Sequence, residues 1–188
     1  MDDPKLTRRP LGHTGLSVTP LGLAAQPVSS WGRRGAPALS ADEVEQAFHE
    51  HGINTFLVHT SMRAQAEGVR RLIRAGHRDE LVLVSEASLP LGGSVRRALD
   101  KQLHALGTDR LDAWLMGWVR GRWYLRDAVW GEMTRAKEQG LTRALGLSAH
   151  DRPLAAALAH ELPIDGVCCS VFALCVDRIS QQCSCCIC

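Results

Sequence analysis

The sequence predicts an α/β fold built around a parallel sheet. Short apolar segments alternate along the chain with segments of helical period, which indicates repeated βα units. The apolar segments are nearly continuous, as expected for strands covered on both faces. With 188 residues, the chain suits one domain or one domain plus a tail. A parallel barrel and a doubly wound sheet both fit this pattern, but no GxGxxG follows the first strand, which disfavours a dinucleotide-binding doubly wound sheet.

The first half of the chain contains three predicted strands and two predicted helices. An extended segment at 16–25 follows the turn between Gly12 and Gly15. Ser40 and Glu43 have the spacing of a capping box, so a helix is expected from there to about His51. The next elements are a strand at 53–59, a helix at 64–75 and a strand at 81–87.

The second half continues the alternation. Ser94 is predicted to cap a helix that runs through Leu106, and Gly107 and Gly140 are predicted to end helices. The expected elements after that first helix are a strand at 111–118, a helix at 127–139, a strand at 143–148, a helix at 153–160 and a last strand at 166–174. Trp114 and Trp118, in or just after one strand, are interpreted as packing residues.

Composition excludes several classes of protein. Hydrophobic residues make up 45% and charged residues 22%, which excludes a disordered chain, a coiled coil and a collagen. No run reaches the roughly 20 apolar residues of a membrane span, and the N-terminus lacks the apolar stretch of a signal peptide. The formal net charge is +2 with interleaved signs, so charge gives no argument for nucleic acid. We therefore expect a cytoplasmic protein with neither a membrane nor a nucleic-acid partner.

The seven cysteines divide the chain into two unlike parts. All of them lie between Cys168 and Cys188. We therefore predict a body at residues 1–175 and an irregular Cys-rich tail at residues 176–188.

Five segments of the body resemble one enzyme family. They are RPLGHTGLSVTPLGLA at 9–24, HGINTF at 51–56, LGTDRLDAWLM at 106–116, EQGLTRALGLSAH at 138–150 and LPIDGV at 162–167. In this order and spacing they resemble aldo-keto reductases over roughly residues 8–174. The resemblance implies an opening hairpin and an incomplete (β/α)8 barrel of TIM type with about six parallel strands. It also implies carbonyl reduction with NADPH.

The four catalytic positions of that family are all substituted here. Leu57 stands at the position of its Asp, Met62 at that of its proton-donating Tyr, Glu86 at that of its Lys and Gly117 at that of its His. Hydride delivery to a carbonyl builds negative charge on oxygen, which needs a proton donor and positive neighbours. Leu57 and Met62 cannot donate a proton. Glu86 is an anion unless burial raises its pKa enough for it to act as the acid.

The positions that contact the cofactor in the family are only partly retained. Ser148 matches the family's Ser of the pair that holds the nicotinamide amide, whereas Ala149 and Cys168 replace its Asn and Gln. No cofactor is therefore expected, and NADPH is implied by the resemblance alone. A sheet of six parallel strands cannot close into a barrel as eight strands do, so its edge strands remain unpaired. A barrel-completing chain, a homo-oligomer and a marginally stable body are the alternatives.

The tail allows two interpretations. Cys183, Cys185, Cys186 and Cys188 form a CxCCxC pattern that resembles metallothioneins, and closely spaced thiolates suit Zn or Cu. Alternatively, Ser184 and the same four cysteines are the substrate of a peptide-modifying enzyme, because such segments resemble the core peptides of ribosomally made natural products.

The favoured hypothesis is a non-catalytic body that acts as a leader or carrier and presents this tail for modification. Metal binding by the tail, a residual NADPH-dependent reductase and a truncated or frameshifted remnant of a reductase remain alternatives.

Overall fold

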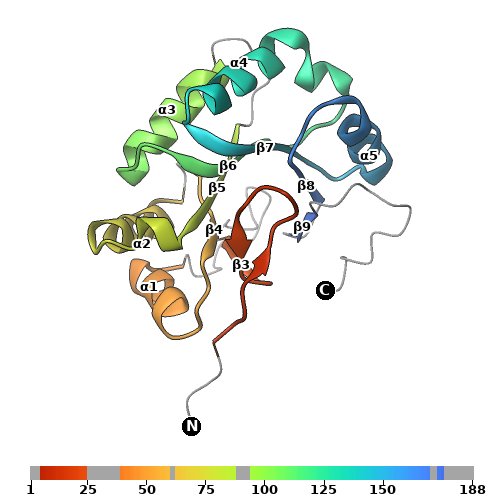
Figure 1. Ribbon diagram of the computed structural model, residues 1–188. Helices are drawn as coiled ribbons and strands as arrows, with labels where there is room; N and C mark the ends of the chain where they lie inside the picture. The colour runs from red at the N-terminus through yellow and green to blue at the C-terminus, as the bar shows by residue number, and fades with distance from the viewer. Residues whose placement is uncertain (1–4, 25–38, 60–61, 88–93, 170–172, 176–188) are drawn as a thin grey trace, which may run out of the picture.

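The computed structural model describes residues 5–24, 39–59, 62–87, 94–169 and 173–175 (Figure 1). These residues form one curved sheet with five α-helices on its outside and a small hairpin, β1 (Arg9–Pro10) and β2 (Ser17–Val18). No helix in these ranges is long and apolar enough to cross a membrane.

Six parallel strands form the body of the sheet. Five parallel pairings join β3 (Gly22–Ala24), β4 (Thr55–Leu57), β5 (Val82–Ala87), β6 (Leu111–Met116), β7 (Thr142–Ala149) and β8 (Gly166–Cys169) in chain order. The predicted incomplete (β/α)8 barrel with about six parallel strands is confirmed. A seventh strand, β9 (Ala173–Cys175), pairs antiparallel with β8, so β3 and β9 form the two edges of the sheet.

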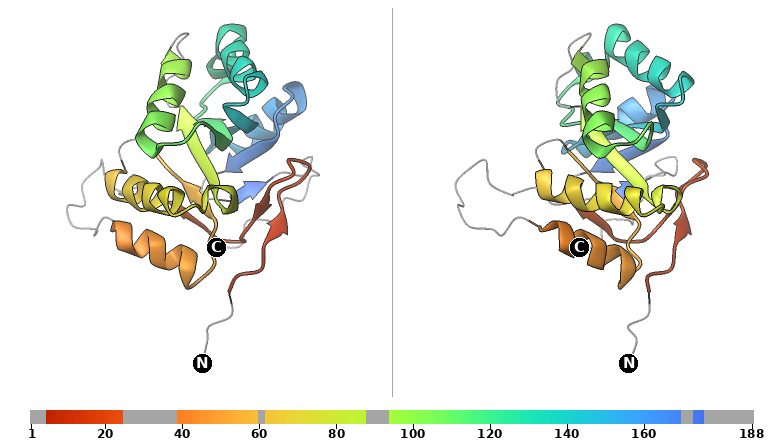
Figure 2. Two further views of the ribbon diagram at one scale, coloured as in Figure 1. Left: turned by 60° about the vertical axis from the view of Figure 1, so that its left-hand side comes forward. Right: turned by 90° about the vertical axis from the view of Figure 1, so that its left-hand side faces the viewer.

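The helices alternate with the strands and follow one another around the outside of the sheet (Figure 2). They are α1 (Ala41–His49), α2 (Arg63–Arg74), α3 (Ser94–Leu106), α4 (Asp127–Glu138) and α5 (Arg152–Glu161), with 3-10 turns η1 (Arg78–Glu80) and η2 (Arg122–Leu125). The predicted capping box is confirmed, since Glu43 N donates to Ser40 Oγ at 3.2 Å and Ser40 N to Glu43 Oε2 at 2.7 Å. Gly52, Gly107 and Gly140 adopt the positive φ that ends a helix.

Three sequence predictions are corrected. The segment 16–25 is two strands in two different sheets, β2 and β3, because Pro20 between them lacks an N–H for a ladder. The segment 166–174 is not one strand, because β8 and β9 run in opposite directions. Ser94 is the first residue of α3 rather than its cap.

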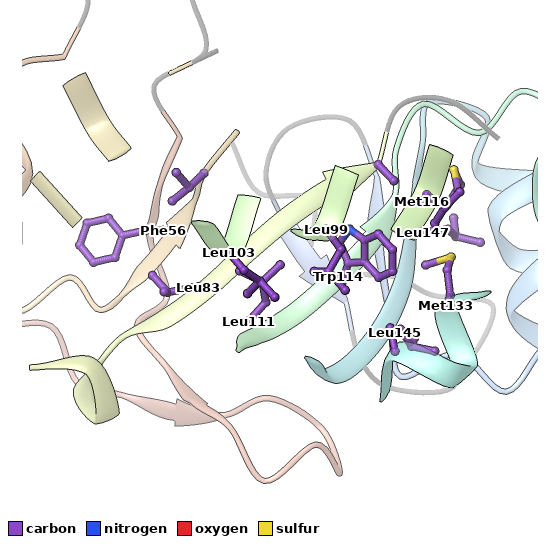
Figure 3. Close-up of a cluster of buried hydrophobic side chains, with 14 of the residues drawn as sticks. Phe56, Leu83, Leu99, Leu103, Leu111, Trp114, Met116, Met133, Leu145 and Leu147 are labelled. Atoms are coloured by element: carbon purple, nitrogen blue, oxygen red, sulfur yellow. The ribbon is translucent and has the colours of Figure 1, made fainter. Parts of the chain in front are cut away.

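The core has two layers, one on each face of the sheet. The larger layer lies between the sheet and the helices and includes Phe56, Trp114, Met116, Met133 and Leu147 (Figure 3). The smaller layer lies on the inner face, where the hairpin residues Leu11 and Leu16 pack against strand residues such as Val84 and Leu115. Side chains alternate between the two faces along each strand. The residues that follow Val84 and Leu115 by two, Glu86 and Gly117, therefore lie on the inner face.

Buried polar groups fix the opposite end of the sheet, where the strands begin. Asn54 Oδ1 accepts from Thr19 N at 2.8 Å, and Asn54 Nδ2 donates to Ser17 O at 2.7 Å, which attaches the hairpin strand to β4. Asp112 accepts from Leu83 N at 2.9 Å and from Arg78 at 3.0 Å. At the carboxyl ends of the strands, where α/β barrels place their sites, two buried amides bond the first strands instead: Gln65 Nε2 donates to Leu23 O at 3.0 Å and Gln102 Nε2 to Val58 O at 3.2 Å.

Candidate functional site

The four substituted positions lie together at the carboxyl ends of neighbouring strands. Leu57 ends β4, Met62 precedes α2, Glu86 is in β5 and Gly117 follows β6. Because β4, β5 and β6 are adjacent in the sheet, the fold brings these positions to the carboxyl end of the sheet, with Leu57, Glu86 and Gly117 on its inner face. The fold therefore brings together the four positions that the resemblance assigns to the family's catalytic residues.

The first two positions are apolar. Leu57 is half-buried against the inner core layer, and Met62 is 6% exposed. The backbone of Met62 donates to His59 O at 2.8 Å, which fixes the chain as it enters α2. A thioether and an isobutyl group provide neither a proton nor a charge at this end of the sheet.

Glu86 and Gly117 occupy one shared space. A Cβ atom on Gly117 would lie 2.8 Å from Glu86 Oε2, 3.2 Å from its Cβ and 3.3 Å from its Cδ. The Glu86 carboxyl therefore occupies the space that a side chain at position 117 would otherwise enter. The two substitutions are structurally coupled, a relationship that the sequence analysis, which treated them separately, did not find.

The carboxyl of Glu86 is partly withdrawn from water. Burial raises its pKa, while a hydrogen bond with the Ser148 hydroxyl and the proximity of His150 act in the opposite direction. Among the described residues, no lysine or arginine forms an ion pair with Glu86. Glu86 is therefore a half-buried carboxyl whose polar neighbours are a hydroxyl and an imidazole.

The predicted cofactor contact, Ser148, lies in the same cluster. Its hydroxyl is engaged by Glu86, and its neighbour Ala149 is buried in the layer that faces the helices. Cys168 pairs in register with Ser148, but its side chain lies outside the described residues. The amide-binding set that the resemblance implies for NADP(H) is only partly retained, because Ser148 keeps a hydroxyl while Ala149 has no polar group. Of these two described positions, Ser148 alone offers the nicotinamide amide a polar side chain.

The loop after β6 adds residues that the sequence analysis missed or misassigned. Trp114 is buried as predicted, but Trp118 is 43% exposed and is not a core residue. Trp118 has a φ of 57°, rare for a residue other than glycine, and its ring meets the His150 ring edge-to-face at 5.4 Å. Nothing in the local sequence marks Trp118 for that backbone conformation.

The tail predictions lie outside the described residues. This applies to Cys183, Ser184, Cys185, Cys186 and Cys188, for which both metal binding and modification stay predictions. Within the described ranges, no group of three or more His, Cys, Asp or Glu side chains is arranged to hold a metal ion.

Comparison with known families settles the relationship of the chain. The family described as Aldo/keto reductase matches residues 30–182. The chain belongs to the aldo/keto reductase family. This confirms the resemblance drawn from the five sequence segments. A search of curated proteins finds no match.

Solved aldo-keto reductases have the same fold. A Pseudomonas aeruginosa protein assigned to the family is 27% identical, with a TM-score of 0.67 over 85% of this chain and 65% of its own. An aldo/keto reductase from Brucella melitensis is 21% identical, with a TM-score of 0.64 over 85% of this chain and 60% of its own. One from Bombyx mori, solved in complex with NADP, is 20% identical, with a TM-score of 0.64 over 86% of this chain and 56% of its own. The chain thus spans 56% to 65% of the length of these relatives.

Proposed function

We propose that this chain is a non-catalytic aldo/keto reductase whose body carries and presents residues 176–188 for post-translational modification. The observation that supports the first half is the pairing of Glu86 with Gly117, which puts a carboxyl where the resemblance implies a Lys, in the space that a side chain at position 117 would enter. The composition of the tail, with four cysteines and Ser184 in its last six residues, supports the second half.

The chemistry of carbonyl reduction argues against activity at this site. The carbonyl oxygen gains negative charge as hydride arrives, so a donor must stabilise it. Leu57 and Met62 supply no donor, and an ionised Glu86 would repel the developing oxyanion. The Ser148 hydroxyl beside this carboxyl favours its charged form and lowers its pKa, which does not help Glu86 to act as the proton donor.

The proposal implies two kinds of partner. A peptide-modifying enzyme would act on the tail while it holds the folded body. A second protein chain, either a barrel-completing protein or another copy, would pair with the sheet edges β3 and β9. Light scattering of the purified full chain would distinguish a homo-oligomer from a monomer that requires a different partner.

The first experiment tests the catalytic half. The purified chain is titrated with NADPH by cofactor fluorescence and then assayed for NADPH oxidation with a panel of aldehydes and ketones. The Bombyx mori relative, which was crystallised with NADP, serves as the positive control. We expect neither saturable binding nor turnover. Saturable binding together with turnover would overturn the proposal and establish a residual reductase.

The second experiment tests the role of the tail. The intact mass of the protein from its native host is measured and residues 176–188 are mapped by fragmentation, before and after thiol alkylation. Loss of water or hydrogen localised to Ser184 and its neighbouring cysteines would support modification. A tail of unmodified mass whose thiols all alkylate after Zn or Cu is stripped would overturn it and support the metal-thiolate alternative.

A further inference from the structure

Four side chains gather where strands β5, β6 and β7 end. Glu86 of β5 fills the space beside Gly117, and the Ser148 hydroxyl of β7 lies close enough to lower the pKa of the Glu86 carboxyl. His150, just after β7, acts electrostatically on Glu86. Its ring packs edge-to-face on the Trp118 ring, with the ring centroids 5.4 Å apart. His150 therefore connects the carboxyl to the exposed indole, and the group forms one cluster.

The backbone holds Trp118 in its unusual conformation. On one side Gly117 N donates to Ala87 O at 2.8 Å, and on the other Val119 N donates to Ser148 O at 2.8 Å. The φ of 57° at Trp118 is thus imposed by hydrogen bonds to the two neighbouring strands. A strained backbone kept by its surroundings is characteristic of binding sites. Here its effect is to leave a large aromatic ring 43% exposed beside a polar cluster.

We propose that this cluster binds an organic cation, an ammonium or guanidinium group, through the Glu86 carboxyl and the exposed part of the Trp118 indole. This goes beyond the proposed carrier function, because it assigns a ligand class to the end of the sheet where the family places its reaction. It does not depend on the fate of the tail.

The chemistry of the cluster favours a cation over other ligands. In its ionised form Glu86 only accepts hydrogen bonds, and among the described residues no Lys or Arg pairs with it; the imidazole of His150 is the neighbour that acts on it electrostatically. An indole face attracts ammonium and guanidinium ions. A metal ion is a poorer match, because the described residues offer no group of three metal-ligating His, Cys, Asp or Glu side chains. An anion would be repelled by the carboxylate.

The test uses the full chain and small probes of defined charge. Nα-acetyl-lysine methylamide and Nα-acetyl-arginine methylamide are titrated by NMR or calorimetry, and the uncharged norleucine and citrulline analogues serve as matched ligands. We expect the charged probes to bind at least about tenfold more tightly than the uncharged ones. Glu86→Gln and Trp118→Leu are each expected to weaken binding of the charged probes about tenfold.

Two control variants make the same kinds of substitution at residues outside the cluster. Glu138→Gln removes an exposed carboxylate at the end of α4, next to the start of β7 and so at the opposite end of the sheet. Trp123→Leu removes an indole that is 58% exposed and packs on Tyr124 instead. Both should bind the charged probes as the unmodified chain does.

The proposal is overturned by equal binding of charged and uncharged probes, by unchanged affinity in Glu86→Gln, or by no saturable binding at all. Circular dichroism of each variant checks folding. If Glu86→Gln does not fold, Glu86→Asp provides a second test, since it keeps the charge but shortens its reach and should still prefer charged probes. NADPH titration and tail mass are separate readouts, so this inference and the proposed function can fail independently.

Discussion

The carboxyl oxygen Oε2 of Glu86 lies 2.8 Å from the point where a Cβ atom on Gly117 would be. Contact that close is repulsive, so a side chain at position 117 and the Glu86 carboxyl cannot both occupy this space. A side chain at position 117 would displace the flexible end of Glu86 from its place beside Gly117. Substitutions at the two positions are therefore expected to influence each other.

Gly117→Ala tests this coupling. We expect the substitution to lower the free energy of unfolding by about 1 kcal/mol, because the flexible end of Glu86 must move and its Cβ must shift slightly. In a Glu86→Ala background the same substitution should change stability by less than about 0.5 kcal/mol, since the space is then free. Urea denaturation of the four proteins of this cycle measures the coupling.

A second glycine provides the control for Gly117→Ala. Gly131 lies within α4, and a Cβ there would meet only Arg135 Nη1 at 3.5 Å. Gly131→Ala should raise stability by about 0.5–1 kcal/mol, because alanine favours a helix. Equal effects of Gly117→Ala in both backgrounds would show that Glu86 and Gly117 are not coupled.

The raised pKa of Glu86 predicts a pH dependence of stability. Because burial disfavours its charged form, the folded chain holds this proton more tightly than the unfolded chain does. Its contribution to folding is therefore fully favourable below the ordinary value of 4.5 and is lost as pH rises through the raised value. The glutamine in Glu86→Gln is uncharged at every pH, so the variant does not lose this stability as pH rises.

The difference between the two proteins isolates the effect of Glu86. Urea midpoints of the unmodified chain and of Glu86→Gln should be similar at about pH 4 and should separate by about pH 8, with the variant more stable. His59, whose pKa is lowered by burial and by Lys101, contributes the opposite slope to both proteins and cancels in the comparison. A constant difference at every pH would contradict the prediction.

The order of the elements follows from the sequence because each is a local pattern. The capping box at Ser40 and the apolar run of β5 need no distant partner to be recognised. The direction of β9 could not be predicted, since an apolar run does not reveal whether it pairs parallel or antiparallel. The same holds for the contact of Glu86 with Gly117, which depends on the register of β5 and β6, where Glu86 pairs with Leu115.

The close contact of α1 and α2 depends on another glycine. A Cβ on Gly68 would lie 2.6 Å from the Cβ of Val44 and 2.7 Å from the carbonyl oxygen of Ala41. Neither atom is the end of a flexible side chain, so Gly68→Ala must push the two helices apart. We expect a loss of about 2–3 kcal/mol in urea denaturation, despite the better helix propensity of alanine. A gain in stability, as expected for Gly131→Ala, would show that the helices accommodate the methyl group.

The variant Asp112→Ala tests how much the buried polar contacts at the start of the strands stabilise the fold. The Asp112 carboxylate is buried, accepts from Leu83 N at 2.9 Å and pairs with Arg78, whose side chain is 13% exposed, at 3.0 Å. Asp112→Ala would leave a buried N–H and a largely buried guanidinium without this partner, so we expect a loss of about 3 kcal/mol. Asp79→Ala is the control, because that side chain is 88% exposed where it pairs with Arg110, and it should cost less than about 0.5 kcal/mol. Similar losses in the two variants, measured by urea denaturation, would mean that burial of the Asp112 pair adds nothing to its effect on stability.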